Sequence, residues 1–169
     1  MPTGSCLCGE IKIAYTGDPA FTAICYCHDD RKINNFAVFQ VPKANFSITQ
    51  GEPKVYTKKS DHGNDISNHF CPECGVTLFR TGGEPKMKDN IGLRAGVLDD
   101  QTILDKPLGI EVFVERRPPW IKPIDGAIQL NGMYQLVSFW SLWGVLTGRL
   151  KLLLSSLIPF RTSGIKKDV

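Results

Sequence analysis

Six cysteines stand in three close pairs along the chain. The pairs are Cys6 with Cys8, Cys25 with Cys27, and Cys71 with Cys74. Thiolates spaced one or two residues apart can converge on a single soft cation, and four thiolates gathered from distant parts of a chain are a common ligand set for zinc. The pairing therefore predicts a domain in which zinc is central to both the folding and the chemistry.

The segment Cys-Pro-Glu-Cys-Gly at residues 71–75 has the sequence of a zinc knuckle. Its two thiolates flank a tight turn, and Gly75 is free to take a positive φ, so that backbone N–H groups can approach the sulfur atoms. The segment Gly-Ser-Cys-Leu-Cys-Gly at residues 4–9 offers two more thiolates. A closed shell of four thiolates leaves no coordination position for a substrate, which predicts a structural zinc. Its ligands would be Cys6, Cys8, Cys71 and Cys74.

The middle pair, Cys25 and Cys27, is left for reactivity. Two thiolates alone make a poor metal site, and a third ligand could come from Asp30 or from one of the two residues before it. Two thiolates, a carboxylate and an open position would make a catalytic zinc that binds or polarises a substrate. The alternative is that no second metal binds here, and that the charged residues after Cys27 form a solvated turn.

Dithiol redox chemistry is another alternative for the paired cysteines. A redox C-x-x-C normally opens a helix, whereas the apolar residues 76–79 after the knuckle indicate a strand. The N-terminus lacks a positive segment followed by an apolar one, so we expect no secretory signal, and disulfides are then disfavoured. We therefore expect a cytoplasmic protein whose thiols bind metal.

The composition argues against a nucleic-acid partner. The net charge is +3 and 22% of the residues are charged, but no run of lysine and arginine and no basic helix face occurs. The 42% of hydrophobic residues suit one globular domain with a core and an appendage.

The elements that must position the cysteines read as short strands separated by Gly, Pro and Asp, which favours antiparallel sheets. No long helical pattern occurs before residue 130, and residues 61–65 read as a hairpin turn. The predicted strands are residues 10–15, 36–41, 46–48, 55–57, 76–80, 90–96 and 109–115.

The character of the chain changes near its C-terminus. We predict a domain at residues 1–131 and a hydrophobic, helical tail at residues 132–169, in which Arg149 and Lys151 separate two apolar halves. Neither half reaches the roughly 18 to 20 residues of a membrane span. Packing on the domain, self-association and attachment to a membrane surface all remain open for this tail.

Taken together, these segments resemble one protein family over residues 4–126. The matching segments are residues 4–9, Cys25-x-Cys27 with the following Arg31-Lys32, and residues 69–75, 93–100 and 112–120. They resemble the glutathione-dependent formaldehyde-activating enzymes, a group that includes the centromere protein V proteins. The resemblance implies a β-tent fold of antiparallel sheets around a structural zinc held by the first and last cysteine pairs.

The resemblance also implies a second zinc, which the family holds with three cysteines in a C-x-C-x-x-C pattern. The first two map to Cys25 and Cys27, and the third falls on Asp30. A carboxylate is a harder ligand than a thiolate and donates less charge. We therefore expect a second zinc site that is weaker, more electrophilic or empty.

The activity implied by the resemblance is that of a carbon–sulfur lyase acting on the adduct of an aldehyde with glutathione or another small thiol. The catalytic residues would be Cys25, Cys27 and Asp30, and the cations of Arg31 and Lys32 would attract the carboxylates of glutathione, unless they are only solvated surface charges. The alternative is a non-catalytic scaffold or accessory binding protein with one zinc and a degenerate second site. We expect Trp120 to fill the core.

Overall fold

The structure is a computed structural model that describes residues 1–33 and 37–133 of the 169-residue chain. These residues form eleven strands, one short α-helix and five 3-10 helices, so the prediction of a mainly β protein is confirmed. The identification as a β-tent and the domain boundary at residue 131 stay predictions. Residues 134–169 of the predicted tail lie outside the described residues. Within the described ranges, no helix has the length and apolarity needed to cross a bilayer.

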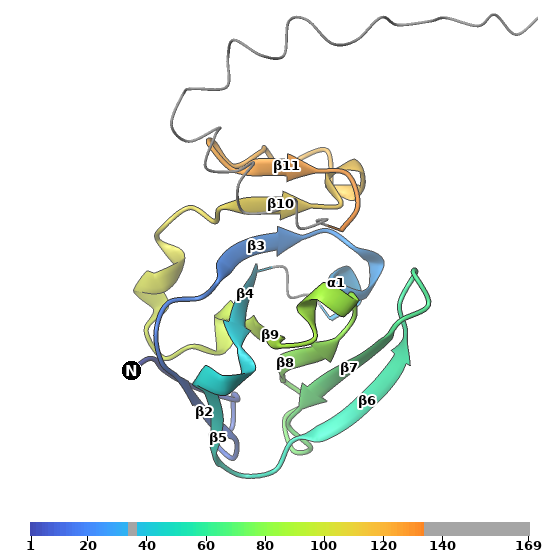
Figure 1. Cartoon of the computed structure of the whole chain (residues 1–169). Helices are drawn as coiled ribbons and strands as arrows, with labels where there is room; N and C mark the ends of the chain where they lie inside the picture. The colour runs from blue at the N-terminus through green and yellow to red at the C-terminus, as the bar shows by residue number, and fades with distance from the viewer. Residues whose placement is uncertain (34–36, 134–169) are drawn as a thin grey trace, which may run out of the picture. The chain divides into compact units, whose positions relative to one another are not determined.

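The strands form two sheets (Figure 1). The first has three antiparallel strands, in the order β1 (Thr3–Ser5), β2 (Lys12–Tyr15) and β5 (Phe46–Gln50). The second has eight, in the order β11 (Ile128–Leu130), β10 (Ile110–Val112), β3 (Phe21–Cys25), β4 (Ala37–Pro42), β9 (Asn90–Arg94), β8 (Thr77–Gly82), β7 (Asp65–Phe70) and β6 (Lys54–Lys59).

Short helices connect several of these strands. The α-helix α1 (His28–Lys32) follows β3 after two residues. The 3-10 helices are η1 (Lys43–Asn45), η2 (Pro85–Met87), η3 (Ala95–Val97), η4 (Gln101–Leu104) and η5 (Val114–Arg116).

The eight-stranded sheet has two different ends (Figure 1). At one end, β10 and β11 lie beside β3, and at the other end the β6–β7 hairpin projects from β8. The edge strand β6 is mostly exposed and carries Lys54, Lys58 and Lys59, whose charges disfavour pairing with a further strand. The predicted turn between β6 and β7 is present, closed by Ser60 N–H donating to the carbonyl of Asn64 at 2.8 Å.

The main core lies between the two sheets and contains two of the six cysteines. The apolar side chains of β2 are fully buried against those of β4, β8 and β9. Cys6 and Cys71 belong to the same cluster, with exposures of 3% and 0%. Ile13 and Tyr15 are buried as the alternation at residues 10–15 predicts, and Ala14 between them is buried as well. The residues of β2 and its neighbours that are most deeply buried are Ile11, Ile13, Tyr15, Val41, Leu78 and Leu93.

The prediction of wholly antiparallel sheets is wrong at one end. Strand β10 pairs in parallel with both β3 and β11, with Ile110 opposite Ala23 on one side and Ile128 on the other. Parallel neighbours need a long connection, and residues 113–127 supply one between β10 and β11. The prediction for Trp120 is also wrong, because this residue lies in that surface connection and is 77% exposed.

A buried carboxylate fastens this connection to the sheet. Glu111 of β10 is fully buried, and its Oε1 accepts from the hydroxyl of Tyr26 at 2.6 Å. Its Oε2 accepts from the backbone N–H of Ile124 at 2.9 Å and from the side-chain amide of Gln129. Burial alone would raise the pKa of Glu111, but these hydrogen bonds and the charge of Arg117 hold this pKa below its usual value. Glu111 is therefore a structural carboxylate that stabilises the fold more when ionised than when protonated.

Replacing Glu111 by glutamine should lower the free energy of unfolding at pH 7 by about 2 to 3 kcal/mol, because charge-assisted bonds are lost in a buried site. The depressed folded pKa means that this contribution is complete above the unfolded pKa of about 4.3 and is lost as the pH falls through the folded value. Urea unfolding of both proteins at pH 7 and at about pH 3 should show a difference that shrinks in acid. A difference that stays constant would contradict this role.

Candidate metal centres and cavity

The first and last cysteine pairs meet in space, as the sequence predicts. Cys6 and Cys8 lie in the turn between β1 and β2, and Cys71 and Cys74 lie in the turn between β7 and β8. Their four sulfur atoms all lie within 4.8 Å of one another. Cys8 Sγ is 3.5 Å from Cys6 Sγ and 3.6 Å from Cys71 Sγ. Sulfur atoms at the corners of a zinc tetrahedron lie about 3.8 Å apart, so this donor set fits one zinc ion.

The backbone around both turns is suited to thiolates. Gly9 and Gly75, which follow the two pairs, take positive φ values of 78° and 73°. The backbone N–H of Ile11 donates to Cys6 Sγ at 3.2 Å. A hydrogen bond from the backbone N–H of Val76 lowers the pKa of Cys74 to about 6. A cation held here would clamp the three-stranded sheet to the eight-stranded sheet.

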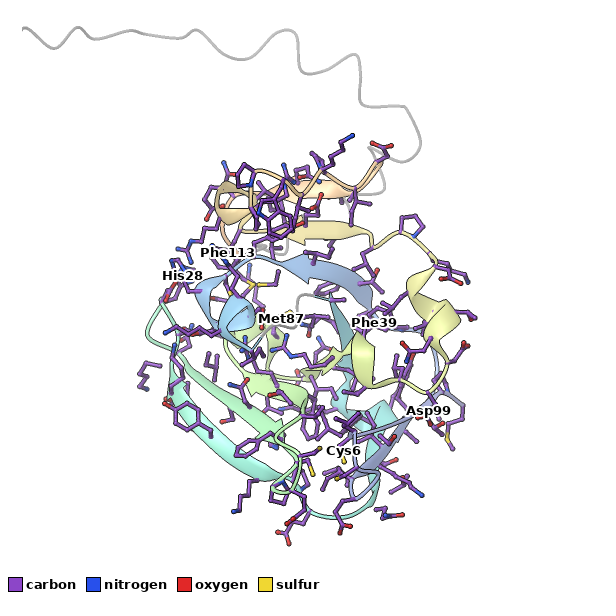
Figure 2. All side chains as sticks on the ribbon, turned by 180° about the vertical axis from the view of Figure 1, so that it is seen from behind. Cys6, His28, Phe39, Met87, Asp99 and Phe113 are labelled. Atoms are coloured by element: carbon purple, nitrogen blue, oxygen red, sulfur yellow. The ribbon has the colours of Figure 1, made fainter. Side chains whose placement is uncertain are left out.

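The middle cysteine pair forms a second cluster with Asp30, which shares no residue with the first (Figure 2 shows Cys6 in the lower part of the domain and His28, which follows Cys27, at its upper left side). Donor atoms of Cys25, Cys27 and Asp30 all lie within 4.8 Å of one another. No fourth donor of the described part of the chain joins them. Unlike the four-cysteine cluster, this set leaves a coordination position open, as catalytic zinc sites do.

The start of α1 brings these three donors together. Cys25 is the last residue of β3, and Cys27 is the N-cap of α1, where its sulfur accepts from the backbone N–H of Asp30 at 3.4 Å. Asp30 stands three residues into the helix, where an N-cap residue and an acidic side chain usually face each other. Its Oδ2 lies 3.4 Å from Cys27 Sγ, close to the separation of about 3.5 Å between oxygen and sulfur ligands of one zinc.

Two arginines hold the other oxygen of Asp30. Oδ1 lies 2.7 Å from Nη2 of Arg94 on β9 and 3.1 Å from Nη1 of Arg80 on β8. The side chains of Asp30 and Arg94 are 3% and 1% exposed, and that of Arg80 is 16% exposed. Charges this deeply buried need partners, and here the carboxylate and the two guanidinium groups supply them to one another.

The two thiols of this cluster have unequal acidity. The hydrogen bond between Cys25 and Cys27 raises the pKa of Cys25, and burial and the charge of Asp30 raise it further. The same hydrogen bond lowers the pKa of Cys27, helped by the backbone N–H of Asp30 and the charge of Arg80. Cys27 is therefore the more acidic thiol of the pair, and the Cys25 thiol donates a hydrogen bond to its sulfur.

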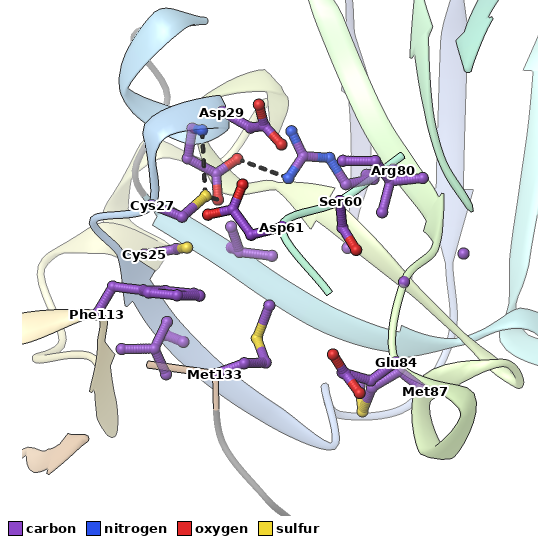
Figure 3. Close-up of a pocket in the computed structure, with 18 of the residues that line it drawn as sticks. Cys25, Cys27, Asp29, Ser60, Asp61, Arg80, Glu84, Met87, Phe113 and Met133 are labelled. Atoms are coloured by element: carbon purple, nitrogen blue, oxygen red, sulfur yellow. Dashed lines mark hydrogen bonds and ion pairs between the residues drawn. The ribbon is translucent and has the colours of Figure 1, made fainter. Parts of the chain in front are cut away.

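This cluster lines a cavity of about 110 Å³. Figure 3 shows Phe113 and Met133 on the same side of the cavity as Cys25, with Glu84 and Met87 across from them. The turn between β6 and β7 contributes residues 60–62, and α1 contributes its first residues. The wall thus combines apolar side chains with numerous polar and ionisable ones.

Two ion pairs and a histidine–carboxylate hydrogen bond involve residues that line this cavity. Lys58 lies 2.6 Å from Asp29, and the hydrogen bond between them raises the pKa of Lys58. Nη1 of Arg116 lies 3.1 Å from Asp61 and lowers the pKa of that carboxyl, and His62 Nδ1 lies 2.8 Å from Glu84 Oε1. These contacts connect β6 to α1, and the β6–β7 turn to η5 and to the residue before η2.

Phe113 is a member of the cavity wall that sequence reasoning places wrongly. Residues 109–115 alternate as in one strand, but Phe113 has φ 56° and ψ 43°, a conformation that bulky residues rarely adopt. It lies just beyond the end of β10, and the guanidinium carbon of Arg116 lies 4.9 Å from the centroid of its ring. Strain of this kind persists where the surroundings enforce it, often beside a functional site.

The remaining predicted site residues lie elsewhere. Arg31 and Lys32 are exposed in the last turn of α1 and are not among the described residues that line the cavity, so their predicted role in binding glutathione stays a prediction. Arg80 and Arg94, which the sequence reasoning missed, do line it. Each interrupts an apolar strand with a charge, and Arg94 also lies in the segment 93–100 that carries the family resemblance, but neither signal points to a metal site.

Comparison with known proteins agrees with the resemblance seen in the motifs. Residues 1–116 match the model of a family described as glutathione-dependent formaldehyde-activating enzyme. The crystal structure of a Rhodobacter sphaeroides protein from a structural-genomics programme has a TM-score of 0.49 and 16% identity, and covers 61% of this chain and 93% of that chain. No curated protein matches the chain.

Proposed function

Because the chain belongs to the glutathione-dependent formaldehyde-activating enzyme family, we propose that it is a carbon–sulfur lyase-like enzyme that joins a small thiol to an aldehyde carbon or separates them. In the forward direction the thiol S–H bond breaks and a C–S bond forms. The thiol proton ends on the carbonyl oxygen, and the product is a hemithioacetal. The reverse direction releases the aldehyde, and neither direction needs an oxidant or a reductant. Glutathione is the thiol that the family description suggests.

The observation that carries this proposal is the convergence of Cys25, Cys27 and Asp30 at the wall of a cavity. We propose that these three residues hold a catalytic zinc, and that Cys6, Cys8, Cys71 and Cys74 hold a structural one. A zinc ion with an open position would stabilise a substrate thiolate or polarise an aldehyde oxygen.

The other residues of the cavity would bind the substrates and move the proton. Phe113 and Met133 form an apolar surface beside Cys25 that would exclude water from the reacting carbon (Figure 3). His62 Nδ1 faces Glu84, so Nε2 is the ring nitrogen left to exchange a proton between the thiol and the carbonyl oxygen.

The test measures how fast glutathione and formaldehyde exchange with their adduct. NMR gives this rate from the interconversion of the free and adduct signals. The zinc-loaded protein should accelerate exchange above the uncatalysed rate, and Asp30→Asn should lower this acceleration by about 10- to 100-fold, because an amide is a poorer ligand than a carboxylate. Asp29→Asn is the matched control, since Asp29 is the adjacent carboxylate and is paired with Lys58. No acceleration by the zinc-loaded wild-type protein would contradict the proposal.

A second candidate function is a non-catalytic scaffold or accessory binding protein with one zinc. The observation that favours it is the pairing of Asp30 with Arg80 and Arg94, which would also suit a carboxylate that serves only as their counter-ion. Replacing Asp30 by cysteine separates the two candidates. Zinc uptake or thiol–aldehyde activity that arises only in this variant would support the scaffold.

A further inference from the structure

We infer that Arg80 and Arg94 are positioning residues for the second metal site, because they hold Oδ1 of Asp30 and leave Oδ2 as the single oxygen that faces the two thiols. This inference rests on the proposed function. It assigns to the arginines the role of orienting Asp30 as a zinc ligand at the position where the family pattern has a cysteine. Neither arginine belongs to any of the cysteine motifs from which the metal sites were predicted.

A carboxylate at this position has a problem that a thiolate does not have. A thiolate offers one donor atom, whereas a carboxylate offers two equivalent oxygens on a torsion with broad minima. An oxygen left without a partner in a buried site is costly. Asp30 is 2% exposed, so its second oxygen needs a protein partner rather than bulk water. Arg94 at 2.7 Å and Arg80 at 3.1 Å pair with Oδ1 through their charges, although Oδ1 accepts no hydrogen bond of standard geometry.

The charges of the cluster lead to the same conclusion. Two thiolates and a carboxylate would bring three negative charges together within 4.8 Å. The two guanidinium groups leave one net negative charge in the buried cluster before a divalent cation binds. A group that binds the non-coordinating oxygen of a carboxylate ligand fixes the orientation of that ligand. Loss of such a group usually weakens metal binding by about 10- to 100-fold.

The sheet itself holds Arg80 in place. Arg80 lies opposite Asn68 on one neighbouring strand and Gly92 on the other, and its Nε donates to Asn68 Oδ1 at 2.8 Å. A Cβ at Gly92 would lie 3.3 Å from Val38 and 3.9 Å from Cβ of Arg80, so the absent side chain keeps this part of the sheet open. Contacts therefore run from Asn68 through Arg80 and Asp30 to Cys27 (Figure 3 shows the contacts of Arg80 and Cys27).

The experiment compares a cycle of single and double variants. The zinc affinity of the second site is measured by competition with a chelator. The absorption spectrum of the cobalt-substituted protein is the second measurement. Arg80→Met should weaken this site at least tenfold, within the range for residues that orient a ligand. In the Asp30→Cys background the same Arg80→Met change should alter affinity by a clearly smaller factor, because a thiolate has no second oxygen to orient and only the effect of the Arg80 charge remains. Arg117→Met is the matched control, since Arg117 pairs with Glu111 away from the cavity.

A more conservative variant keeps the inference testable if Arg80→Met does not fold. Asn68→Ala leaves every charge in place and removes only the bond that orients Arg80, so it should weaken the second site less than Arg80→Met does, but measurably. Retention of the zinc at the four-cysteine cluster reports that each variant is folded. If Arg80→Met does not fold, Asn68→Ala decides the question.

Several results would overturn the inference. An unchanged zinc affinity of the second site in Arg80→Met would overturn it. If Arg80→Met does not fold, an unchanged affinity in Asn68→Ala would overturn it. An equal loss of affinity with and without the Asp30→Cys replacement would also do so. These results leave the proposed function standing if the wild-type protein binds two zinc ions. A wild-type protein that binds only one zinc would contradict the proposed function and this inference together.

Discussion

Replacing Cys71 by serine should leave the chain without a cooperative fold. Cys71 is fully buried, and its sulfur belongs to the four-cysteine cluster that joins the two sheets. Structural zinc contributes about 10 to 16 kcal/mol of apparent folding free energy in small zinc peptides. A domain of ordinary stability has only about 5 to 15 kcal/mol in total, so loss of this ion would remove most of it. Thermal unfolding followed by circular dichroism, together with the zinc content, measures the effect.

The matched control is Glu73→Gln, in the same turn. Glu73 is exposed and is not a donor of the cluster. Its replacement should therefore leave the free energy of unfolding within about 0.5 kcal/mol of the wild-type value. A Cys71→Ser protein that unfolds cooperatively, with stability within about 2 kcal/mol of wild type, would show that the cluster is not what holds the sheets together.

Replacing Cys25 by serine should have the opposite profile, with the fold kept and the activity lost. The two cysteine clusters share no donor residue, so the four-cysteine cluster stays intact in this variant. We expect the zinc content to fall from two ions to one. The thiol–aldehyde exchange should fall by more than about 100-fold, beyond the range for residues that only orient a ligand.

Met87→Leu is the control for Cys25→Ser. Met87 lines the same cavity and is 6% exposed, but its side chain is not a donor of the cluster, and the exchange preserves volume. This variant should keep two zinc ions and most of the activity. Equal losses in both variants would indicate that disturbance of the cavity, rather than loss of a ligand, lowers the rate.

Local features of the site were predictable from the sequence because they depend on neighbouring residues. The glycines after two cysteine pairs mark tight turns, and Gly9 and Gly75 do have positive φ. The alternation at residues 10–15 reflects one buried face of a strand, so β2 follows from it. The convergence of the first and last cysteine pairs also follows from residue type, because separate pairs of thiolates share a preference for one cation.

The features that sequence reasoning missed depend on pairings between distant strands. The parallel pairing of β10 with β3 joins segments about 90 residues apart, and nothing local encodes it. Arg80 and Arg94 read as polar interruptions of strands, and only the assembled sheet brings both to Asp30. Phe113 has a left-handed backbone conformation, which a bulky residue rarely adopts, so no local signal predicts this conformation.

The most direct test of the account is to count zinc in the reduced, full-length protein by native mass spectrometry and atomic absorption. The account predicts two zinc ions per chain. A mild chelator should remove one of them with the fold intact, and removal of the other should unfold the domain, as circular dichroism would show. A reduced protein that contains no metal and still unfolds cooperatively would contradict the account.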